Sequence, residues 1–183
     1  HKQIAEDASF DVHVLPAWRP DKAMNLEKPD YREYIQKLSE VSGVKISTFE
    51  DLKKALIIRL DFFASMGCLV SDHGLEYVMY EPAADTEIEA IFTKAMNQES
   101  ITRREEMQFK TAFLTFLCGE YKKKNWVLQL HYGVKRDNNQ PMFSKIGPDT
   151  GYDCINNYAP SAQTADFLNH LEERGCLPRT ILY

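Results

Sequence analysis

Three short stretches of the chain share one pattern, in which a run of apolar residues ends abruptly in charged or imidazole side chains. They run from Val12 to Asp21, from Cys68 to Gly74 and from Trp126 to Gly133. Apolar runs of roughly four to eight residues bounded by turn residues are typical of buried parallel strands. The predicted strands cover residues 10–17, 68–71, 126–131 and 180–183.

Between these runs, apolar residues recur at helical spacing, and capping signals mark the helix ends. Ser47 or Thr48 can cap a helix with acidic residues in its first turn, and Gly43 can close the helix before it. The predicted helices cover residues 31–41, 48–66, 86–97, 102–124 and 161–174. This alternation of strands and helices predicts an α/β fold with a parallel sheet and right-handed crossovers. Residues 132–160 form a long polar connection, typical of a functional or partly structured segment.

Composition narrows the class of protein. The 183 residues are 44% hydrophobic and 27% charged, enough for one sizeable core. A net charge of −5 with interspersed signs argues against a nucleic-acid partner. No apolar run reaches the roughly 18 residues that cross a bilayer, so no membrane partner is expected, and no secretion signal is visible.

The four cysteines contain no C-x-x-C pair, and we interpret them as structural thiols, which favours a cytoplasmic location. The chain does not begin with Met, and its last residues look like a strand just starting. We therefore expect a piece of a longer protein.

Two strand-end histidines are the first candidates for chemistry. His73 follows Asp72 and precedes Gly74, and His131 ends the third apolar run. Functional residues gather at the carboxyl ends of parallel strands, so these positions predict one shared site. An imidazole there can move a proton, ligate a metal or donate to a substrate oxygen. The alternative for each is a structural histidine bonded to a backbone carbonyl.

Two arginines are the candidate anchors for an anionic ligand. Arg19 follows Trp18 in a rigid loop, and a guanidinium holds a carboxylate through two parallel hydrogen bonds. The alternative is an internal salt bridge to Asp21 or another acid. Arg136 and Asn138 follow the third strand and suit a polyhydroxy ligand. Their alternative is a turn built from Asn and Asp residues.

Several familiar motifs do not occur in the sequence. There is no G-x-G-x-x-G, Walker loop, H-E-x-x-H or G-x-S-x-G, so neither a nucleotide enzyme nor a serine hydrolase is supported.

Four segments in order carry a family resemblance that runs across nearly the whole chain. They are Leu15-Pro16-Ala17-Trp18-Arg19-Pro20-Asp21-Lys22-Ala23, Val70-Ser71-Asp72-His73-Gly74, Gln129-Leu130-His131-Tyr132-Gly133 and Gly147-Pro148-Asp149-Thr150-Gly151-Tyr152-Asp153. Together they resemble uronate isomerase (glucuronate isomerase), a divergent branch of the metal-dependent amidohydrolase superfamily. The family usually has another Asn where Asp137 stands here, so the resemblance does not fix the polar contacts of that loop.

The resemblance implies a distorted (β/α)₈ TIM-type barrel with additional helices. Residues 1–183 would be a single incomplete domain holding about strands 4 to 7, since the family's His-x-His strand and its metal-binding aspartate are not in this chain. A full barrel takes roughly 250 residues. We therefore expect the chain by itself to be inactive, and the full-length protein to be a homo-oligomer.

The resemblance also implies an activity in carbohydrate metabolism. The substrate would be a small sugar acid, with D-glucuronate converted to D-fructuronate and D-galacturonate to D-tagaturonate. Such isomerisation needs a base, a polariser of the carbonyl oxygen and anchors for hydroxyls and carboxylate. The expected catalytic residues are Asp72, His73 and His131, and the expected substrate-binding residues are Trp18, Arg19, Arg136 and Asn138.

The cofactor would be a divalent metal, with Zn²⁺ expected, bound mainly by residues outside this chain; His73 or His131 is a candidate ligand. Two alternatives remain open. One is a related hydrolase of the same superfamily, which would use a metal-activated water. The other is a non-catalytic domain whose strand ends bind a ligand.

Overall fold

A parallel sheet of β1 (Val70–Gly74), β2 (Val127–His131) and β5 (Arg179–Leu182) lies at the centre of the computed structural model, which describes residues 2–158 and 160–183. The strand order is β1-β2-β5. Gly74 pairs with His131, and Leu130 pairs with Leu182, so the carboxyl ends of the strands meet at one edge. The predicted α/β class with a parallel sheet is confirmed.

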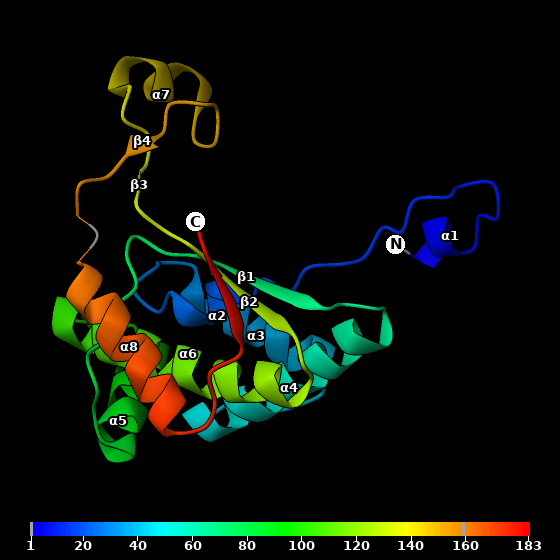
Figure 1. Ribbon diagram of the computed structural model, residues 1–183. Coiled ribbons are helices and arrows are strands. Elements are labelled where there is room, and N and C mark those ends of the chain that lie inside the picture. Colours follow the sequence, from blue (N-terminus) through cyan, green and yellow to red (C-terminus); the bar gives the residue numbers. More distant parts are fainter. Residues whose placement is uncertain (1, 159) are drawn as a thin grey trace.

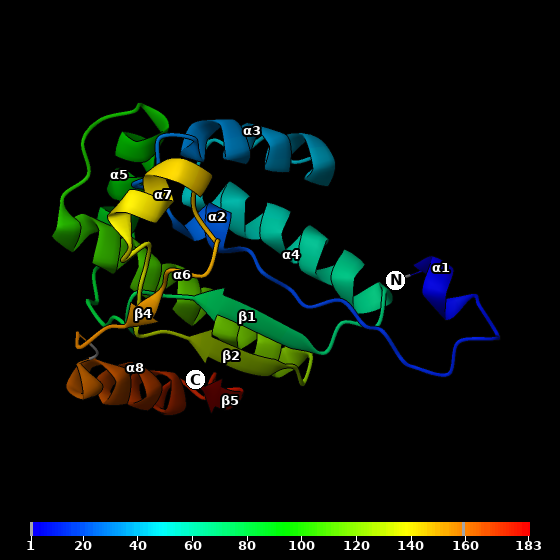
Figure 2. The ribbon, with the colours of Figure 1, turned by 90° about the horizontal axis from the view of Figure 1, so that it is seen from above.

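Helices cover one face of this sheet (Figures 1 and 2). They are α3 (Tyr31–Ser42), α4 (Phe49–Ser65), α5 (Asp85–Met96), α6 (Arg103–Lys123) and α8 (Ser161–Glu173), with the short α2 (Asp21–Met24) beside them. Phe109, Phe113 and Tyr121 of α6 are fully buried, as are Leu128 and Leu130 of β2. The main core therefore lies between the sheet and α6.

Local sequence explains where the helices begin. The Thr48 side chain accepts a hydrogen bond from the Asp51 N–H, and the Asp51 carboxylate accepts one from the Thr48 N–H. Thr102 and Glu105 form the same capping box at α6. Gly43 ends α3 with a φ of 71°, in the left-handed region that favours glycine. These boundaries confirm the helix predictions to within one or two residues.

The predicted strand over residues 10–17 is wrong. Near this segment a single residue, Trp18, bridges to β1. The Trp18 N–H donates to the Val70 carbonyl at 3.0 Å, and the Trp18 carbonyl accepts from the Asp72 N–H at 2.9 Å. Phe10, Val12 and Leu15 are about half exposed or more. Pro16 is buried, but within the described residues no strand pairs with residues 10–17, so no ladder forms there.

The second strand is also displaced from its prediction. It was expected over residues 68–71, but β1 runs from Val70 to Gly74, so Asp72 and His73 lie inside the strand rather than after it. This shift matters because side chains in a strand alternate between the two faces.

Two parts of the chain project from this body (Figure 1). The long connection after β2 forms a small antiparallel pair, β3 (Val134–Lys135) with β4 (Cys154–Ile155), and carries α7 (Gln140–Ile146) at its tip. We call residues 134–155 the β3–β4 arm. The N-terminal segment with α1 (Lys2–Ala5) extends on the other side.

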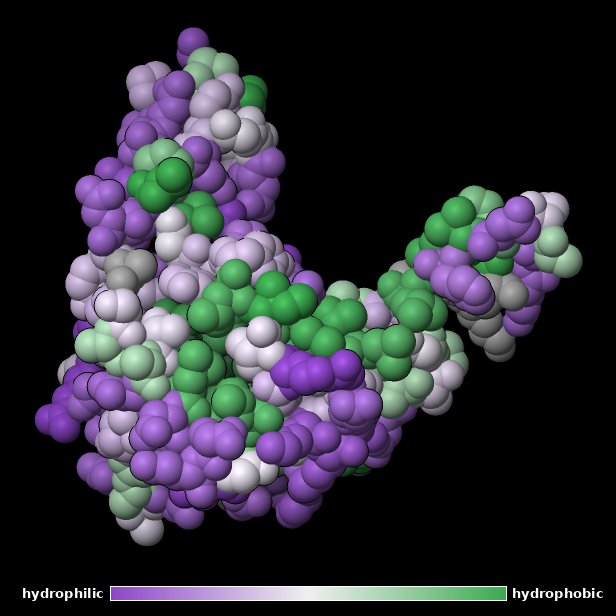
Figure 3. Space-filling model, in the orientation of Figure 1, coloured by the Kyte–Doolittle hydropathy of each residue, from purple (hydrophilic) through white to green (hydrophobic). Residues whose placement is uncertain are grey.

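The face of the sheet opposite the helices is open. Figure 3 shows apolar residues gathered across the middle of the molecule, where Figure 1 shows the strands. Leu69, Ile181 and Tyr183 are among the exposed apolar residues of this region. Among the residues that the structure describes, no helix is long and apolar enough to cross a membrane.

Candidate functional site

Asp72 is the centre of a polar group on the open face of the sheet. Its Oδ2 lies 3.3 Å from the Nε of Arg19, and its Oδ1 accepts a hydrogen bond from the Tyr183 hydroxyl at 2.9 Å. This hydrogen bond is the main cause that raises the pKa of Tyr183, so the phenol stays protonated and donates. The internal salt bridge that was the alternative for Arg19 is therefore formed, chiefly with Asp72.

His131 joins the same group through Tyr183. The two rings stack with centroids 4.9 Å apart, and the imidazole is only partly buried. Tyr183 was not among the predicted site residues. The signal that marks it is the one used for the others, a polar side chain directly after the apolar run of β5.

His73 lies on the opposite face from His131. In the register of the sheet His73 pairs with Leu130, and both side chains are fully buried. The His73 Nδ1 lies 2.8 Å from Asp21 Oδ1, and its Nε2 lies 3.0 Å from the Tyr121 hydroxyl of α6. The expectation that both imidazoles face one cleft is wrong, because adjacent register positions point to opposite faces.

Trp18 packs into the core beside the helices. Its side chain is 5% exposed and meets the Phe63 ring edge-on, with centroids 4.9 Å apart. Its indole Nε1 has no hydrogen-bond partner within residues 2–158 and 160–183. The ring therefore supports the loop that carries Arg19, and its predicted contact with substrate stays a prediction.

Arg136 and Asn138 lie on the β3–β4 arm. Arg136 is paired with Asp153 at 2.6 Å, and the Asn138 N–H donates to the Tyr152 carbonyl. Asp137 has a φ of 54°, a left-handed conformation that Asp tolerates in turns. The alternative of an Asn and Asp turn is therefore formed, and the predicted binding role of these two residues is untested.

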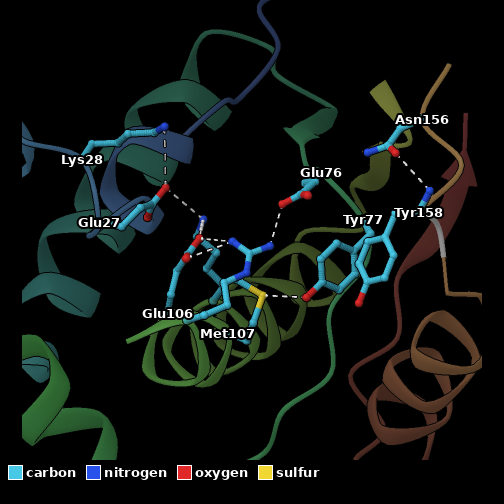
Figure 4. Close-up of polar contacts among 10 residues, drawn as sticks. Glu27, Lys28, Glu76, Tyr77, Glu106, Met107, Asn156 and Tyr158 are labelled. Carbon is cyan, nitrogen blue, oxygen red and sulfur yellow. Dashed lines mark hydrogen bonds and ion pairs between the residues drawn. The ribbon is translucent and has the colours of Figure 1, made fainter. Parts of the chain in front are cut away.

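A second polar group lines a cavity of about 530 Å³ beside the carboxyl end of β1 (Figure 4). Lys110 of α6 lies 2.7 Å from Glu106 and 3.2 Å from Glu27. The Arg103 guanidinium forms ion pairs with Glu106 at 2.9 Å and with Glu76 at 2.6 Å. Gly74 and Arg136 also line this cavity. These charges form one continuous chain across the cavity wall.

Sequence reasoning missed this chain of charges. Burial by itself would raise the pKa of Glu106, but the hydrogen bond and charge of Lys110, helped by Arg103, lower it. The spacings Arg103–Glu106 and Glu106–Lys110 are the i,i+3 and i,i+4 pairs of a helix, and they were visible in the sequence. The sequence did not show that Glu106 and Lys110 are nearly buried in the folded protein, while Arg103 stays half exposed.

The described residues do not by themselves fit a metal centre. No group of three His, Cys, Asp or Glu side chains among them is placed to hold a metal ion. Near Asp72 the side chains in contact are the Arg19 guanidinium and the Tyr183 phenol, and the neighbouring carboxylate of Asp21 is engaged by Arg19, His73 and the Gly74 N–H. We therefore derive no step through a metal.

Comparison with known proteins identifies the family. The family model of glucuronate isomerase matches residues 1–183, the whole chain. This chain belongs to the glucuronate isomerase family. It is 60% identical to uronate isomerase of Lachnoclostridium phytofermentans and 56% identical to that of Lachnospira eligens, in each case over all 183 residues. The chain spans 39% of the length of each of these two relatives.

Solved structures of the same family have the same fold. The crystal structure of uronate isomerase from Thermotoga maritima matches 98% of this chain with a TM-score of 0.88 and 33% identity, over 39% of its own chain. Glucuronate isomerase from Caulobacter crescentus matches the whole chain with a TM-score of 0.85. At 24% identity, that second likeness concerns the fold alone.

Proposed function

We propose that the protein containing this chain is a uronate isomerase, which interconverts D-glucuronate with D-fructuronate and D-galacturonate with D-tagaturonate. The observation that carries the proposal is the family match over the whole chain. The Arg19, Asp72 and His131 side chains at the carboxyl end of a parallel sheet support it. This is where (β/α) barrels and open α/β sheets place their active sites.

The same facts support the proposed barrel. Residues 1–183 would be a single incomplete domain, contributing about strands 4 to 7 of a (β/α)₈ barrel with additional helices. The open apolar face around Leu69 and Ile181 would then be covered by the remainder of the full-length protein. A divalent metal, Zn²⁺ by the family resemblance, would be held mainly by residues outside this chain. The full-length protein is proposed to be a homo-oligomer.

The chemistry is assigned to residues of the open face. In the open-chain aldose a base removes the proton from C2 while O1 gains a proton, and the proton returns to C1 as the O2 hydroxyl becomes a carbonyl. Asp72 and His131 are the candidate proton carriers of this face, and Arg19 is proposed to bind the C6 carboxylate. Arg136 and Asn138 would contact the substrate from the β3–β4 arm. His73 retains a proposed part in catalysis through its contacts with Asp21 and Tyr121.

The test is an assay of the full-length protein with glucuronate and galacturonate, with and without a chelator. We expect isomerisation, loss of activity on removal of the metal, and a large loss in Asp72→Asn. Asp61→Asn is the matched control, because Asp61 makes only an exposed ion pair with Lys124. Absence of isomerisation with both uronates would contradict the proposal.

A further inference from the structure

Asp21 joins the loop of Arg19 to strand β1. Its Oδ2 accepts a hydrogen bond from the Gly74 N–H at 2.8 Å, and its Oδ1 lies 2.8 Å from His73 Nδ1. Immediately before Arg19, Trp18 makes two backbone hydrogen bonds to the same strand. Arg19 therefore lies between two points at which its loop is fixed to β1.

The protons of this network can be assigned from its partners. A carboxylate only accepts hydrogen bonds, so Asp21 requires the proton of His73 on Nδ1. Nε2 then accepts from the Tyr121 hydroxyl, 3.0 Å away. Burial raises the pKa of Tyr121 well above its ordinary value, so this phenol keeps its proton. With a neutral imidazole, each buried group of the chain Tyr121–His73–Asp21 is satisfied.

The Arg19 guanidinium lies where this network ends. Its Nε is 3.3 Å from Asp72 Oδ2 and 3.8 Å from Asp21 Oδ2, although its side chain is 52% exposed. A Cβ on Gly74 would lie 2.8 Å from Arg19 Nη2, so the strand leaves room for the guanidinium only because residue 74 is glycine. A half-exposed arginine side chain is ordinarily mobile. Here the carboxylates of Asp21 and Asp72, together with the backbone of Gly74, restrict the Arg19 guanidinium to one position.

We propose that Asp21 and His73 are positioning residues that hold Arg19 beside Asp72, ready for the substrate carboxylate. The inference rests on the proposed function only in taking Arg19 as the carboxylate anchor. Asp21 sets the position of the loop and one side of the guanidinium, and His73 fixes the Asp21 carboxylate from the protein interior. Neither residue has to touch the substrate.

The test is a double-mutant cycle in the full-length protein. Asp21→Asn keeps the size of the side chain but removes its charge and turns one acceptor into a donor. Displacement of a binding group by about 1 Å can cost about 100-fold in rate, so we expect kcat/KM for glucuronate to fall by about 10- to 100-fold. In an Arg19→Met background the same substitution should change kcat/KM by less than about 3-fold, because its effect is exerted through Arg19.

A merely structural role gives a different result, an equal loss in both backgrounds, and that result would overturn the proposal. His170→Gln is the matched control. His170 also contacts a tyrosine hydroxyl, that of Tyr80 at 3.3 Å, but it lies on α8 away from Arg19. We expect this variant to leave kcat/KM unchanged.

A crystal structure of the full-length Asp21→Asn variant separates the two proposals. If the wild-type protein does not isomerise uronates, the proposed function fails, but the position of Arg19 can still be measured. The positioning proposal expects Arg19 to leave ion-pair distance of Asp72 in this variant. An unchanged Arg19–Asp72 pair would refute it, whatever the activity.

Discussion

His73 and His131 lie one register position apart on neighbouring parallel strands, and their side chains leave the sheet on opposite faces. His73 is enclosed between Asp21 and Tyr121, whereas His131 stacks on Tyr183 at the open face. The two imidazoles therefore have different surroundings, and substitution should separate a contribution to stability from a contribution to activity.

The first prediction concerns these two histidines. His73→Ala leaves the Asp21 carboxylate and the Tyr121 hydroxyl without a buried partner, so we expect it to lower the free energy of unfolding by about 2–4 kcal/mol. His131→Ala should change that free energy by less than about 1 kcal/mol and remove most of the activity. Chemical denaturation and uronate turnover measure the two effects. Equal destabilisation by both substitutions would contradict the assignment.

The second prediction compares the two arginines. A charge-assisted hydrogen-bonded pair contributes about 1.5–3 kcal/mol, so Arg19→Met should lower kcat/KM by about 10- to 150-fold. Arg19→Lys should recover only part of this loss, because an ammonium keeps the charge but not the planar donor pair. Arg136→Met should have the smaller effect, since Arg136 uses Nη1 for a 2.6 Å hydrogen bond to Asp153, whereas Arg19 approaches its carboxylates through Nε at 3.3 and 3.8 Å. A larger loss in Arg136→Met would move the anchor to the arm.

The third prediction concerns Gly74. In Gly74→Ala the new methyl group meets the end of the flexible Arg19 side chain at 2.8 Å, which can move aside. We expect stability to change by less than about 1 kcal/mol, and kcat/KM to fall toward that of Arg19→Met. Gly119→Ala is the control, because its added Cβ would have Cys176 as its nearest neighbour at an ordinary 3.8 Å. Wild-type activity in Gly74→Ala would show that Arg19 need not stay where it lies.

The fourth prediction concerns the charges of the cavity. Lys110→Met would leave Glu106, whose side chain is 9% exposed, with Arg103 as its remaining cation. Removing one partner of a buried ion pair is strongly destabilising, and we expect a loss of about 2–4 kcal/mol. The double variant Lys110→Met with Glu106→Leu should recover a large part of it. The urea midpoint measures both, and Lys37→Met, which breaks the exposed pair with Glu33, is the control.

The fifth prediction concerns acid stability. The hydrogen bond from Lys94, followed by those from Thr102, lowers the pKa of Glu105 from 4.5 to about 2. A carboxyl whose pKa is depressed in the folded state stabilises the fold above its unfolded pKa, and that contribution is lost as pH falls from about 4.5 to about 2. Glu105→Gln should therefore destabilise near neutral pH and have little effect at pH 2.

Melting temperatures of wild type and Glu105→Gln between pH 2 and pH 7 check this prediction. Glu40→Gln, a substitution of an exposed glutamate on α3, is the control and should leave the pH dependence unchanged. A Glu105→Gln effect that stays constant over this range would mean that the charge of Glu105 is not what stabilises α6.

Local signals in the sequence determined most of the helices. Thr48 was one of two predicted caps, because an N-cap involves only residues close in sequence, and Gly43 marked a helix end because a single glycine can supply the left-handed conformation. Strand β2 was equally predictable, since the apolar run that marks it is recognised from consecutive residues alone. The motifs around Arg19, Asp72 and His131 also indicated the family by themselves.

The tertiary structure decided which of these residues meet. Strand β1 has polar side chains on both of its faces, so the sequence did not predict that Asp72 faces the open side and His73 the interior. The position of α6, whose Tyr121 contacts His73, decides this. The contact of Tyr183 with Asp72 joins residues 111 positions apart. Residues 10–17 have a strand-like sequence, but no strand among residues 2–158 and 160–183 pairs with them. A strand depends on hydrogen bonds to a distant segment, whereas a helix forms them within itself, and this is why the helices were determined locally and the site was not.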